Sequence, residues 1–395
     1  MDRIKIYNAK IITPYKIIDN GCIIIENGII SQVGAGDIKA DDCILIDAKG
    51  NYVSPGFVDI HTHGGGGHDF MDATAEAYHG ACEMHARHGT TSIVPTTLAS
   101  TFEELEGTFK VYEDAKSGNG KGAEMIGLHL EGPYFSMEQR GAQDPRYIRN
   151  PKPEEYNRVM EISKDIIRWS AAPELDGALE FGRNIKKAGI LPAIAHSDAI
   201  YEQVLEAFEN GFTHITHLYS GMSGVRRINA YRYAGVIESA FLIDEMTVEI
   251  IADGCHLPAS LLKLIYKIKG SSRIALVTDS MRGAGMPDGQ EIILGSLKNG
   301  QKAIVEDGVA KLPDRSAFAG SVATTDRLVR TMIRLADVPL LEAVKMMTST
   351  PAAIIGAADR KGSLVPGKDA DIVIFDSDIN IYMTIVNGKV VYIKK

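Results

Sequence analysis

The stretch Pro55-Gly-Phe-Val-Asp-Ile-His61-Thr-His63-Gly64 places two histidines two positions apart at the end of an apolar run. Residues two apart on a β-strand project to the same side, so His61 and His63 can face one ion together. Neutral imidazole is the commonest metal ligand among side chains and suits Zn, Fe or Mn. Taken alone, the motif also fits a pair of packed or surface histidines.

Four later segments also end an apolar run with a side chain that can bind a metal. They are Leu128-His-Leu-Glu131, Ile190-Leu-Pro-Ala-Ile-Ala-His196, Phe212-Thr-His-Ile-Thr-His217 and Arg273-Ile-Ala-Leu-Val-Thr-Asp279. Short apolar runs bounded by turn residues are typical of buried strands. In a (β/α)8 barrel the chemistry comes from the C-terminal ends of several strands, which is the pattern seen here. The sequence therefore predicts an α/β fold of the (β/α)8 TIM-barrel type, with metal-binding side chains at the strand ends.

Composition and charge limit the class of protein. The chain has 395 residues, of which 45% are hydrophobic and 24% charged, enough for a barrel of about 250 residues and a smaller domain. No apolar run reaches the roughly 18 residues that cross a bilayer, and the N-terminus lacks a long apolar signal region. We expect no membrane partner and a cytoplasmic location, with the four cysteines as free thiols. A net charge of −9 without a basic cluster argues against nucleic acid.

Both ends of the chain show strand and turn patterns, with hairpin signals at Asn27-Gly28 and Asn387-Gly388. Between them, apolar runs alternate with helical stretches, as in a parallel α/β body. The clearest helical stretches are residues 75–88, 201–210 and 324–336. We expect a small β-sandwich domain built from residues 1–55 and 364–395, and a catalytic barrel over residues 56–363.

Across almost the whole chain, the motifs resemble the amidohydrolase superfamily. Within it they are similar to the N-acetylglucosamine-6-phosphate deacetylases and their N-acetylgalactosamine-6-phosphate relatives. The resemblance is carried by the opening stretch and by His88-Gly-Thr-Thr-Ser, His129-Leu-Glu-Gly-Pro-Tyr-Phe, Ala195-His-Ser, Thr216-His-Leu-Tyr, Ile251-Ala-Asp-Gly-Cys-His256, Val277-Thr-Asp-Ser-Met, Ala319-Gly-Ser and Gly367-Lys-Asp-Ala-Asp.

The resemblance implies hydrolysis of the N-acetyl amide of an amino sugar phosphate, which converts N-acetylglucosamine 6-phosphate and water to glucosamine 6-phosphate and acetate. It implies one or two divalent ions such as Zn, Fe or Mn, and a metal-bound hydroxide as nucleophile. The implied metal ligands are His61, His63, Glu131, His196, His217 and Asp279. Asp279 also corresponds to the general base and acid. Glu131 would bridge the two ions, and the family leads us to expect a homodimer.

The chain departs from the family on the side that contacts substrate. Gln143 stands where the family usually has histidine, and Ser220 followed by Gly221 stands where it has an asparagine that contacts phosphate. The usual Arg-Glu-Pro-Gly is replaced by a segment containing Arg226, Arg227 and Arg232, which fits phosphate contacts or a solvated loop equally well. His256 resembles the histidine that contacts substrate. We assign Gln143, Ser220, Gly221, Arg227 and His256 to substrate binding and expect N-acetylglucosamine 6-phosphate to be turned over less well than by typical members.

Two other functions compete with this hypothesis. One is an amidohydrolase acting on a different N-acyl sugar or another small amide. The other is a non-catalytic homologue, which the presence of all six candidate ligands disfavours. Of the remaining histidines, we interpret His68, His79, His85 and His88 as structural or solvated, and His129 and His214 as either packed or in contact with a ligand residue.

Overall fold

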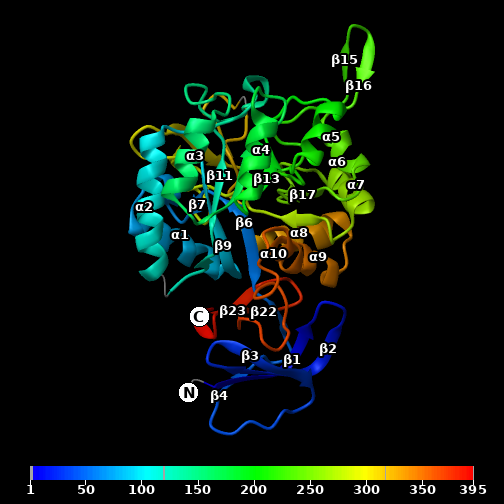
Figure 1. Cartoon of the computed structure of the whole chain (residues 1–395). Coiled ribbons are helices and arrows are strands. Elements are labelled where there is room, and N and C mark those ends of the chain that lie inside the picture. The colour runs from blue at the N-terminus through cyan, green and yellow to red at the C-terminus, as the bar shows by residue number, and fades with distance from the viewer. Residues whose placement is uncertain (1–2, 119–120, 316, 395) are drawn as a thin grey trace.

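The computed structural model describes residues 3–118, 121–315 and 317–394, and its central feature is a barrel of parallel strands (Figure 1). Eight strands follow one another around it: β6 (Phe57–Thr62), β9 (Thr90–Thr97), β11 (Leu128–Glu131), β12 (Ile166–Ala171), β13 (Leu191–Ile194), β14 (His214–Ile215), β17 (Thr247–Ile250) and β18 (Ile274–Leu276). A parallel bridge between Thr62 and Ser280 brings the end of β18 back to β6. The predicted (β/α)8 fold is confirmed.

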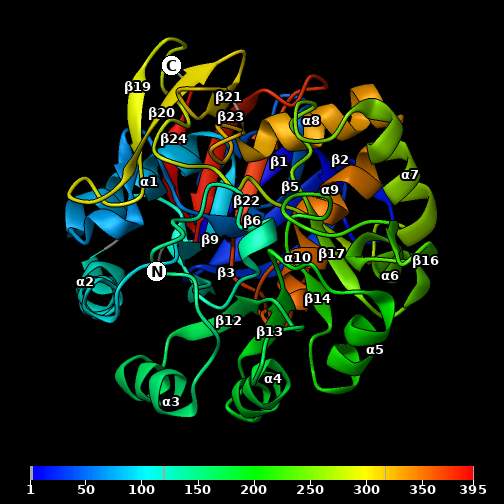
Figure 2. The same ribbon diagram turned by 90° about the horizontal axis from the view of Figure 1, so that it is seen from above.

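Helices surround this barrel, as the view from above shows (Figure 2). They are α1 (Ala75–Arg87), α2 (Phe102–Gly118), α3 (Pro153–Ile162), α4 (Ala178–Lys187), α5 (Tyr201–Glu209), α6 (Val236–Leu242), α7 (Ala259–Lys269), α8 (Thr325–Ala336), α9 (Leu340–Met347) and α10 (Ser349–Ile354). Every residue of β6 and β9 is buried, because both faces of these central strands are covered. Their polar residues are therefore buried as well. None of the described helices is long and apolar enough to cross a membrane.

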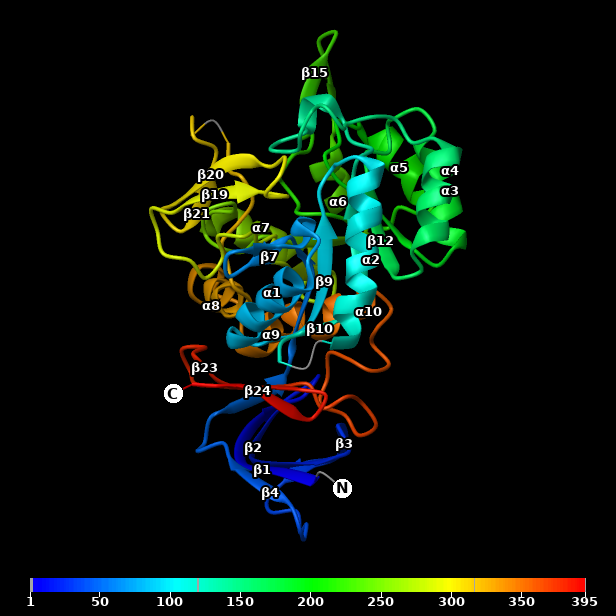
Figure 3. The same ribbon diagram turned by 90° about the vertical axis from the view of Figure 1, so that its left-hand side faces the viewer.

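The two ends of the chain meet in a second sheet below the barrel (Figure 3). Its strands are β1 (Arg3–Ile12), β2 (Ile17–Glu26), β3 (Ile29–Ala35), β4 (Ile44–Asp47), β5 (Tyr52–Pro55), β22 (Ile372–Phe375), β23 (Ile381–Val386) and β24 (Lys389–Ile393). The predicted small β-domain from both termini is confirmed, and its strands form one continuous mixed sheet. We propose the limits 1–55 and 364–395 for this domain.

Both predicted hairpin turns form in this domain. Asn27 and Gly28 have φ of 51° and 81°, and Asn387 and Gly388 have φ of 48° and 75°. Two consecutive positive φ values are what a type I′ hairpin requires. The turns also pack on each other, because a Cβ added at Gly388 would lie 2.7 Å from the Gly28 Cα.

Additional elements stand at the end of the barrel where its strands terminate. The hairpin β15 (Arg226–Ile228) and β16 (Tyr231–Tyr233) projects away from the body (Figure 1). A three-stranded sheet lies between β18 and α8 in sequence: β19 (Glu291–Leu294), β20 (Gln301–Glu306) and β21 (Val309–Lys311). A short pair, β7 (Gly64–Gly65) and β8 (His68–Asp69), follows β6 directly. Together with the loops after the strands, these elements surround the site described next.

Candidate metal centre

Six side chains converge at the C-terminal ends of five barrel strands. The atoms that could bind a metal form two groups, and within each group these atoms lie within 4.8 Å of one another. The first group is His61, His63 and Asp279, and the second is Glu131, His196 and His217. Exposure does not exceed 8% for any of the six residues. The structure therefore brings together all six residues that the sequence indicated as ligands.

Glu131, at the end of β11, lies between the two groups. Its Oε1 is 2.9 Å from His217 Nε2 and 3.3 Å from His196 Nε2, whereas its Oε2 is 3.3 Å from His63 Nε2. Burial alone would raise the pKa of Glu131, but hydrogen bonds from the surrounding histidines hold it well below its ordinary value. An ionised carboxylate with one oxygen toward each group has the placement of a bridging ligand.

Three of the candidate ligands share an uncommon backbone conformation. His196, His217 and Asp279 have φ of 46°, 30° and 45°, and each follows the last residue of a barrel strand by two or three positions. Non-glycine residues rarely adopt this left-handed region, and such strained residues concentrate at functional sites. The chain turns out of the strand here, which directs the side chains inward over the barrel end.

Beneath the ligands lies a buried charged pair that the sequence analysis missed. Glu249 on β17 and Arg168 on β12 are both fully buried and form an ion pair. Glu249 Oε2 lies 3.1 Å from His61 Nδ1, and it accepts a hydrogen bond from the backbone N–H of His217. Burial raises the pKa of Glu249, but the Arg168 guanidinium and the adjacent histidines hold it well below the ordinary range. The sequence offered one indication of this pair, because Arg168 and Glu249 are each a charged residue within a largely apolar strand.

This pair holds two of the candidate ligands, His61 and His217, in place. A carboxylate on Nδ1 fixes the imidazole tautomer that leaves Nε2 free for an ion, and such partners raise ligand basicity. His61 Nε2 has no hydrogen-bond partner among the described residues, although Asp279 Oδ1 is only 3.3 Å away. His61 is thus held in the orientation expected of a ligand.

His129 and His214 lie in the same buried layer. His129 Nε2 is 2.7 Å from Ser170 Oγ, and its ring meets the His61 ring edge-on with centroids 4.7 Å apart. His214 Nδ1 is 2.7 Å from Thr247 Oγ1, and its Nε2 is 3.4 Å from Glu249 Oε1. Burial lowers the pKa of both histidines, so they remain neutral. His129 therefore packs directly against the candidate ligand His61, whereas His214 contacts Glu249, the carboxylate next to His61.

The other histidines have structural contacts. His85 Nε2 lies 3.0 Å from the Gly64 carbonyl oxygen, and His79 Nε2 lies 2.9 Å from the Ala115 carbonyl oxygen. His88 Nδ1 is 3.1 Å from Asp326 Oδ1. These contacts match the structural interpretation of the histidines on and near α1.

A cavity of about 230 Å³ opens over the ligands. Gln143, Ser220, Gly221 and His256, four of the residues assigned to substrate binding, line its walls. Its floor contains five of the candidate ligands, and Phe318 stands at its side with its ring 4.8 Å from that of His256. Five candidate ligands and four of the five residues assigned to substrate binding therefore line the same cavity.

Arg227, the fifth predicted substrate residue, is placed differently. It is exposed on the projecting hairpin and is not among the described residues that line this cavity. Its neighbour Arg226 forms an ion pair with Asp198 and also donates to the Asp198 carbonyl oxygen at 2.7 Å. Arg226 therefore anchors the base of the hairpin, while Arg227 is exposed on β15, whose hairpin projects away from the barrel (Figure 1).

The donor set fits a divalent metal ion. Burial disfavours a charge on His63, yet Asp279 and Glu131 beside it raise its pKa to about 10. The carboxylates thus create a negative potential that favours a cation in the cavity floor. Histidine nitrogens with carboxylate oxygens suit Zn, Fe or Mn, whereas Mg or Ca would favour an all-oxygen set.

A parallel barrel with histidine and carboxylate ligands at its strand ends defines the class of metal-dependent hydrolases. Sequence comparison gives the family within that class. The profile of the Amidohydrolase family matches residues 52–391, and the chain belongs to this family. The resemblance inferred from the motifs is confirmed.

Individual relatives are similar over almost the entire chain. N-acetylglucosamine-6-phosphate deacetylase from Bacillus subtilis (strain 168) is 33% identical, with 99% of this chain and 97% of that protein covered. N-acetylgalactosamine-6-phosphate deacetylase from Escherichia coli O157:H7 is 29% identical, with 96% and 97% covered. A solved structure of an N-acetyl-D-glucosamine-6-phosphate deacetylase variant from Mycobacterium smegmatis, in complex with N-acetyl-D-glucosamine-6-phosphate, has 29% identity and a TM-score of 0.90, with 99% and 100% covered.

Proposed function

We propose that this protein hydrolyses the N-acetyl amide of an amino sugar phosphate, with N-acetylglucosamine 6-phosphate as the first candidate. The observation that carries the proposal is the convergence of six candidate ligand side chains, five of which line one cavity of about 230 Å³. Its support from outside the structure is the set of relatives, which are named as deacetylases of such sugars.

The residues that would hold metal are those of the two groups. Glu131, His196 and His217 would hold one divalent ion, while His61, His63 and Asp279 would hold a second, with Glu131 shared. A bound divalent ion lowers the pKa of water toward neutrality and polarises a carbonyl oxygen. We propose one or two ions of the Zn, Fe or Mn type.

Asp279 is the proposed general base and acid. Burial raises its pKa, but His61 and His63 beside it bring the pKa below its ordinary value, so the carboxylate is ionised at neutral pH. It takes the proton of the attacking water as the C–O bond forms. It then returns that proton to the departing nitrogen as the C–N bond breaks, which leaves a free amine and acetate.

The walls of the cavity would recognise the sugar. Ser220, Gly221 and His256 lie beside the candidate ligands, and His256 Nδ1 is held 2.8 Å from Asp253 Oδ2. This contact fixes the imidazole so that Nε2 can serve the substrate. Phe318, 41% exposed, offers an aromatic face next to it.

We further propose a homodimer. The β15–β16 hairpin carries exposed Val225 and Tyr231 as well as Arg227, and it extends beyond its own barrel (Figure 1). An isolated two-stranded hairpin is marginally stable in water, so a second copy of the chain is a suitable partner for it. Arg227 on this hairpin would then supply phosphate contacts at an interface. A cytoplasmic location fits the four cysteines, which are not joined as disulfides in the described chain.

The test is a rate comparison over sugars. Acetate release should be measured with N-acetylglucosamine 6-phosphate, N-acetylgalactosamine 6-phosphate and their unphosphorylated forms. We expect the phosphorylated sugars to be preferred, because a charged hydrogen bond to phosphate contributes roughly 1.5 to 3 kcal/mol. Equal rates with and without phosphate would contradict the assignment.

A related substrate is the second candidate. Ser220 is shorter than the asparagine usual in the family, so N-acetylglucosamine 6-phosphate should be turned over less well than by typical members. Ser220→Asn should then raise its kcat/KM. If this substitution lowers kcat/KM instead, the natural substrate differs from the first candidate or the contact is made elsewhere.

A further inference from the structure

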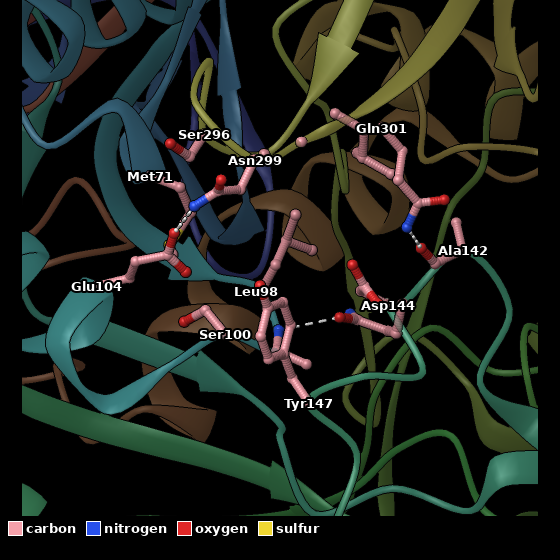
Figure 4. A pocket seen from close by; sticks show the side chains of 15 residues that line it. Met71, Leu98, Ser100, Glu104, Ala142, Asp144, Tyr147, Ser296, Asn299 and Gln301 are labelled. Atoms are coloured by element: carbon pink, nitrogen blue, oxygen red, sulfur yellow. Dashed lines mark hydrogen bonds between the residues drawn. The ribbon is translucent and has the colours of Figure 1, made fainter.

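Gln143 occupies a position between the candidate metal centre and a second, smaller cavity. It is 5% exposed and lines both the 230 Å³ cavity and a neighbouring one of about 50 Å³. Figure 4 shows the smaller cavity, with the adjoining residues Ala142 and Asp144 labelled. Its side chain amide is engaged on both sides. Nε2 donates to Glu131 Oε2 at 2.8 Å, and Oε1 accepts from the backbone N–H of Ala99 at 3.0 Å.

These two contacts fix which end of the amide faces which partner. The Ala99 N–H is only a donor, so the atom facing it is the oxygen of the amide. The ionised Glu131 carboxylate is only an acceptor, so the atom facing it is the nitrogen. Rotating the amide by half a turn would set donor against donor and acceptor against acceptor. The orientation of Gln143 therefore follows from the chemistry of its partners.

The backbone around Gln143 is held as well. Gln301 of β20 donates from Nε2 to the Ala142 carbonyl oxygen at 3.2 Å, and Figure 4 shows this contact across the smaller cavity. Arg140 donates from Nη1 to the Gln143 carbonyl oxygen at 3.2 Å, while the Gln143 N–H donates to the Arg140 carbonyl oxygen at 3.0 Å. The loop after β11 thus presents the amide from a fixed support.

We propose that Gln143 is a positioning residue for Glu131. Its hydrogen bond uses one acceptor site of Oε2 and holds the carboxylate plane, so that Oε1 faces His217 and His196 while Oε2 keeps a second acceptor site toward His63. Glu131 is thereby held as a link between the two ligand groups. This inference rests on the proposed function of the site, and it gives Gln143 a task other than contact with the sugar.

The same chemistry defines the substitutions. A leucine at 143 keeps the volume but removes both the donor and the acceptor. A neutral histidine has one donor and one acceptor nitrogen, so it can accept from Ala99 and donate to Glu131 as the amide does. Ser220→Ala is a matched control, because Ser220 lines the same cavity but forms no hydrogen bond with Glu131 in the part of the chain that the structure describes.

The experiment titrates Zn²⁺ into the metal-free full-length protein and its variants by calorimetry, with bound metal counted by elemental analysis. For Gln143→Leu we expect the binding of at least one ion to weaken by about 10- to 100-fold, the usual cost of losing the partner of a ligand. Gln143→His should restore the wild-type affinity, and Ser220→Ala should leave it unchanged. The proposal would be overturned if the Gln143→Leu variant and the wild-type protein had the same affinity for Zn²⁺.

A second readout separates positioning from substrate contact. At saturating Zn²⁺, Gln143→Leu should keep the wild-type KM and lose kcat. A raised KM with unaltered Zn²⁺ affinity would show that Gln143 contacts substrate and does not position Glu131. The Zn²⁺ titration needs no substrate, so it tests the role of Gln143 independently of the proposed function. A wild-type protein that binds Zn²⁺ but releases no acetate would refute the proposed function, and the titration would still decide whether Gln143 positions Glu131.

Discussion

Asp279 is the residue on which the proposed chemistry depends most. Its carboxylate lies 3.2 Å from His63 Nε2 and is kept ionised by the nearby histidines, despite its burial. Asp279→Asn keeps the shape but cannot take a proton, so we expect kcat to fall by about 10² or more. Steady-state kinetics should be combined with metal analysis of the same samples. Near-normal kcat in a fully loaded variant would remove Asp279 from the reaction.

His85 provides a test of pH dependence that does not involve a candidate ligand. Burial lowers its pKa from 6.5 to about 4, although the Gly64 carbonyl partly offsets this effect. The unfolded chain therefore binds a proton more readily, and the stability from neutral His85 is present above pH 6.5 and lost as pH falls toward 4. The loss from this group between pH 7.5 and pH 5 is about 2 kcal/mol.

The measurement is urea unfolding of wild type and His85→Gln at both pH values. Glutamine can still donate to Gly64 but does not titrate, so the variant should lose less stability on acidification. Loss of metal should affect both proteins alike, because His85 forms hydrogen bonds with Gly64 and Thr62 and none with a candidate ligand among the described residues. Identical losses in the two proteins would mean that His85 is not held neutral.

Some residues of the site can be predicted from the sequence around them, whereas others become recognisable only from contacts between distant segments. His61, His63, Glu131, His196, His217 and Asp279 were predictable because each ends an apolar run within a recognisable motif. Glu249 and Arg168 were not, because a charge inside a strand becomes interpretable only when its partner on another strand is known. The contact between Gln143 and Glu131 is hidden for the same reason, since it depends on the path of a loop.

At the scale of elements, regular segments were predicted well. The helical stretches at 75–88, 201–210 and 324–336 appear as α1, α5 and α8 with ends within one residue, because their amphipathic period is strong. The β15–β16 hairpin and the β19–β21 sheet were not predicted. Four of their five strands have only three or four residues, and only a longer-range arrangement distinguishes them from loops.

The projecting hairpin gives a prediction about assembly. Tyr231 is 74% exposed on it, and a charge there would be buried in the proposed dimer interface. We expect Tyr231→Glu to weaken dimerisation by at least about 10-fold, since interface tyrosines often contribute 2 kcal/mol or more. Sedimentation velocity over a concentration series measures this change.

Tyr15→Glu is the matched control, because Tyr15 is 91% exposed but lies in the terminal domain. It should leave the dimer intact. A wild-type protein that sediments as a monomer, or a Tyr231→Glu protein that dimerises normally, would reject the hairpin as the contact.

At the scale of the whole molecule, a buried lysine connects the barrel to the terminal sheet. The Lys361 side chain is 1% exposed, and its Nζ lies 2.7 Å from Asp371 Oδ2 and 3.0 Å from Asp369 Oδ2. It also pairs with Glu124, the first residue of β10 (Glu124–Met125), which accepts a hydrogen bond from Asn387 as well. Residues from distant parts of the chain therefore share one buried ionic cluster.

Lys361→Met should be strongly destabilising. Removing the cation leaves the buried Asp371 without its ion-pair partner, although Arg360 still pairs with Asp369. Breaking a buried pair in this way typically costs about 3 to 5 kcal/mol. Lys263→Met is the control, because Lys263 and its partner Asp337 are 50% and 76% exposed and such pairs contribute at most about 1 kcal/mol. Urea unfolding of both variants gives the comparison, and equal small losses would show that the cluster does not join the two parts.

The account as a whole is tested most directly by acetate release from N-acetylglucosamine 6-phosphate and N-acetylgalactosamine 6-phosphate, with metal-loaded, chelator-stripped and reconstituted protein. We predict one acetate and one free amine per sugar consumed, activity reduced by at least about 10² on stripping, and recovery with a divalent ion. The proposed function would be contradicted if protein loaded with at least one ion per chain released no more acetate from either sugar than the Asp279→Asn variant does.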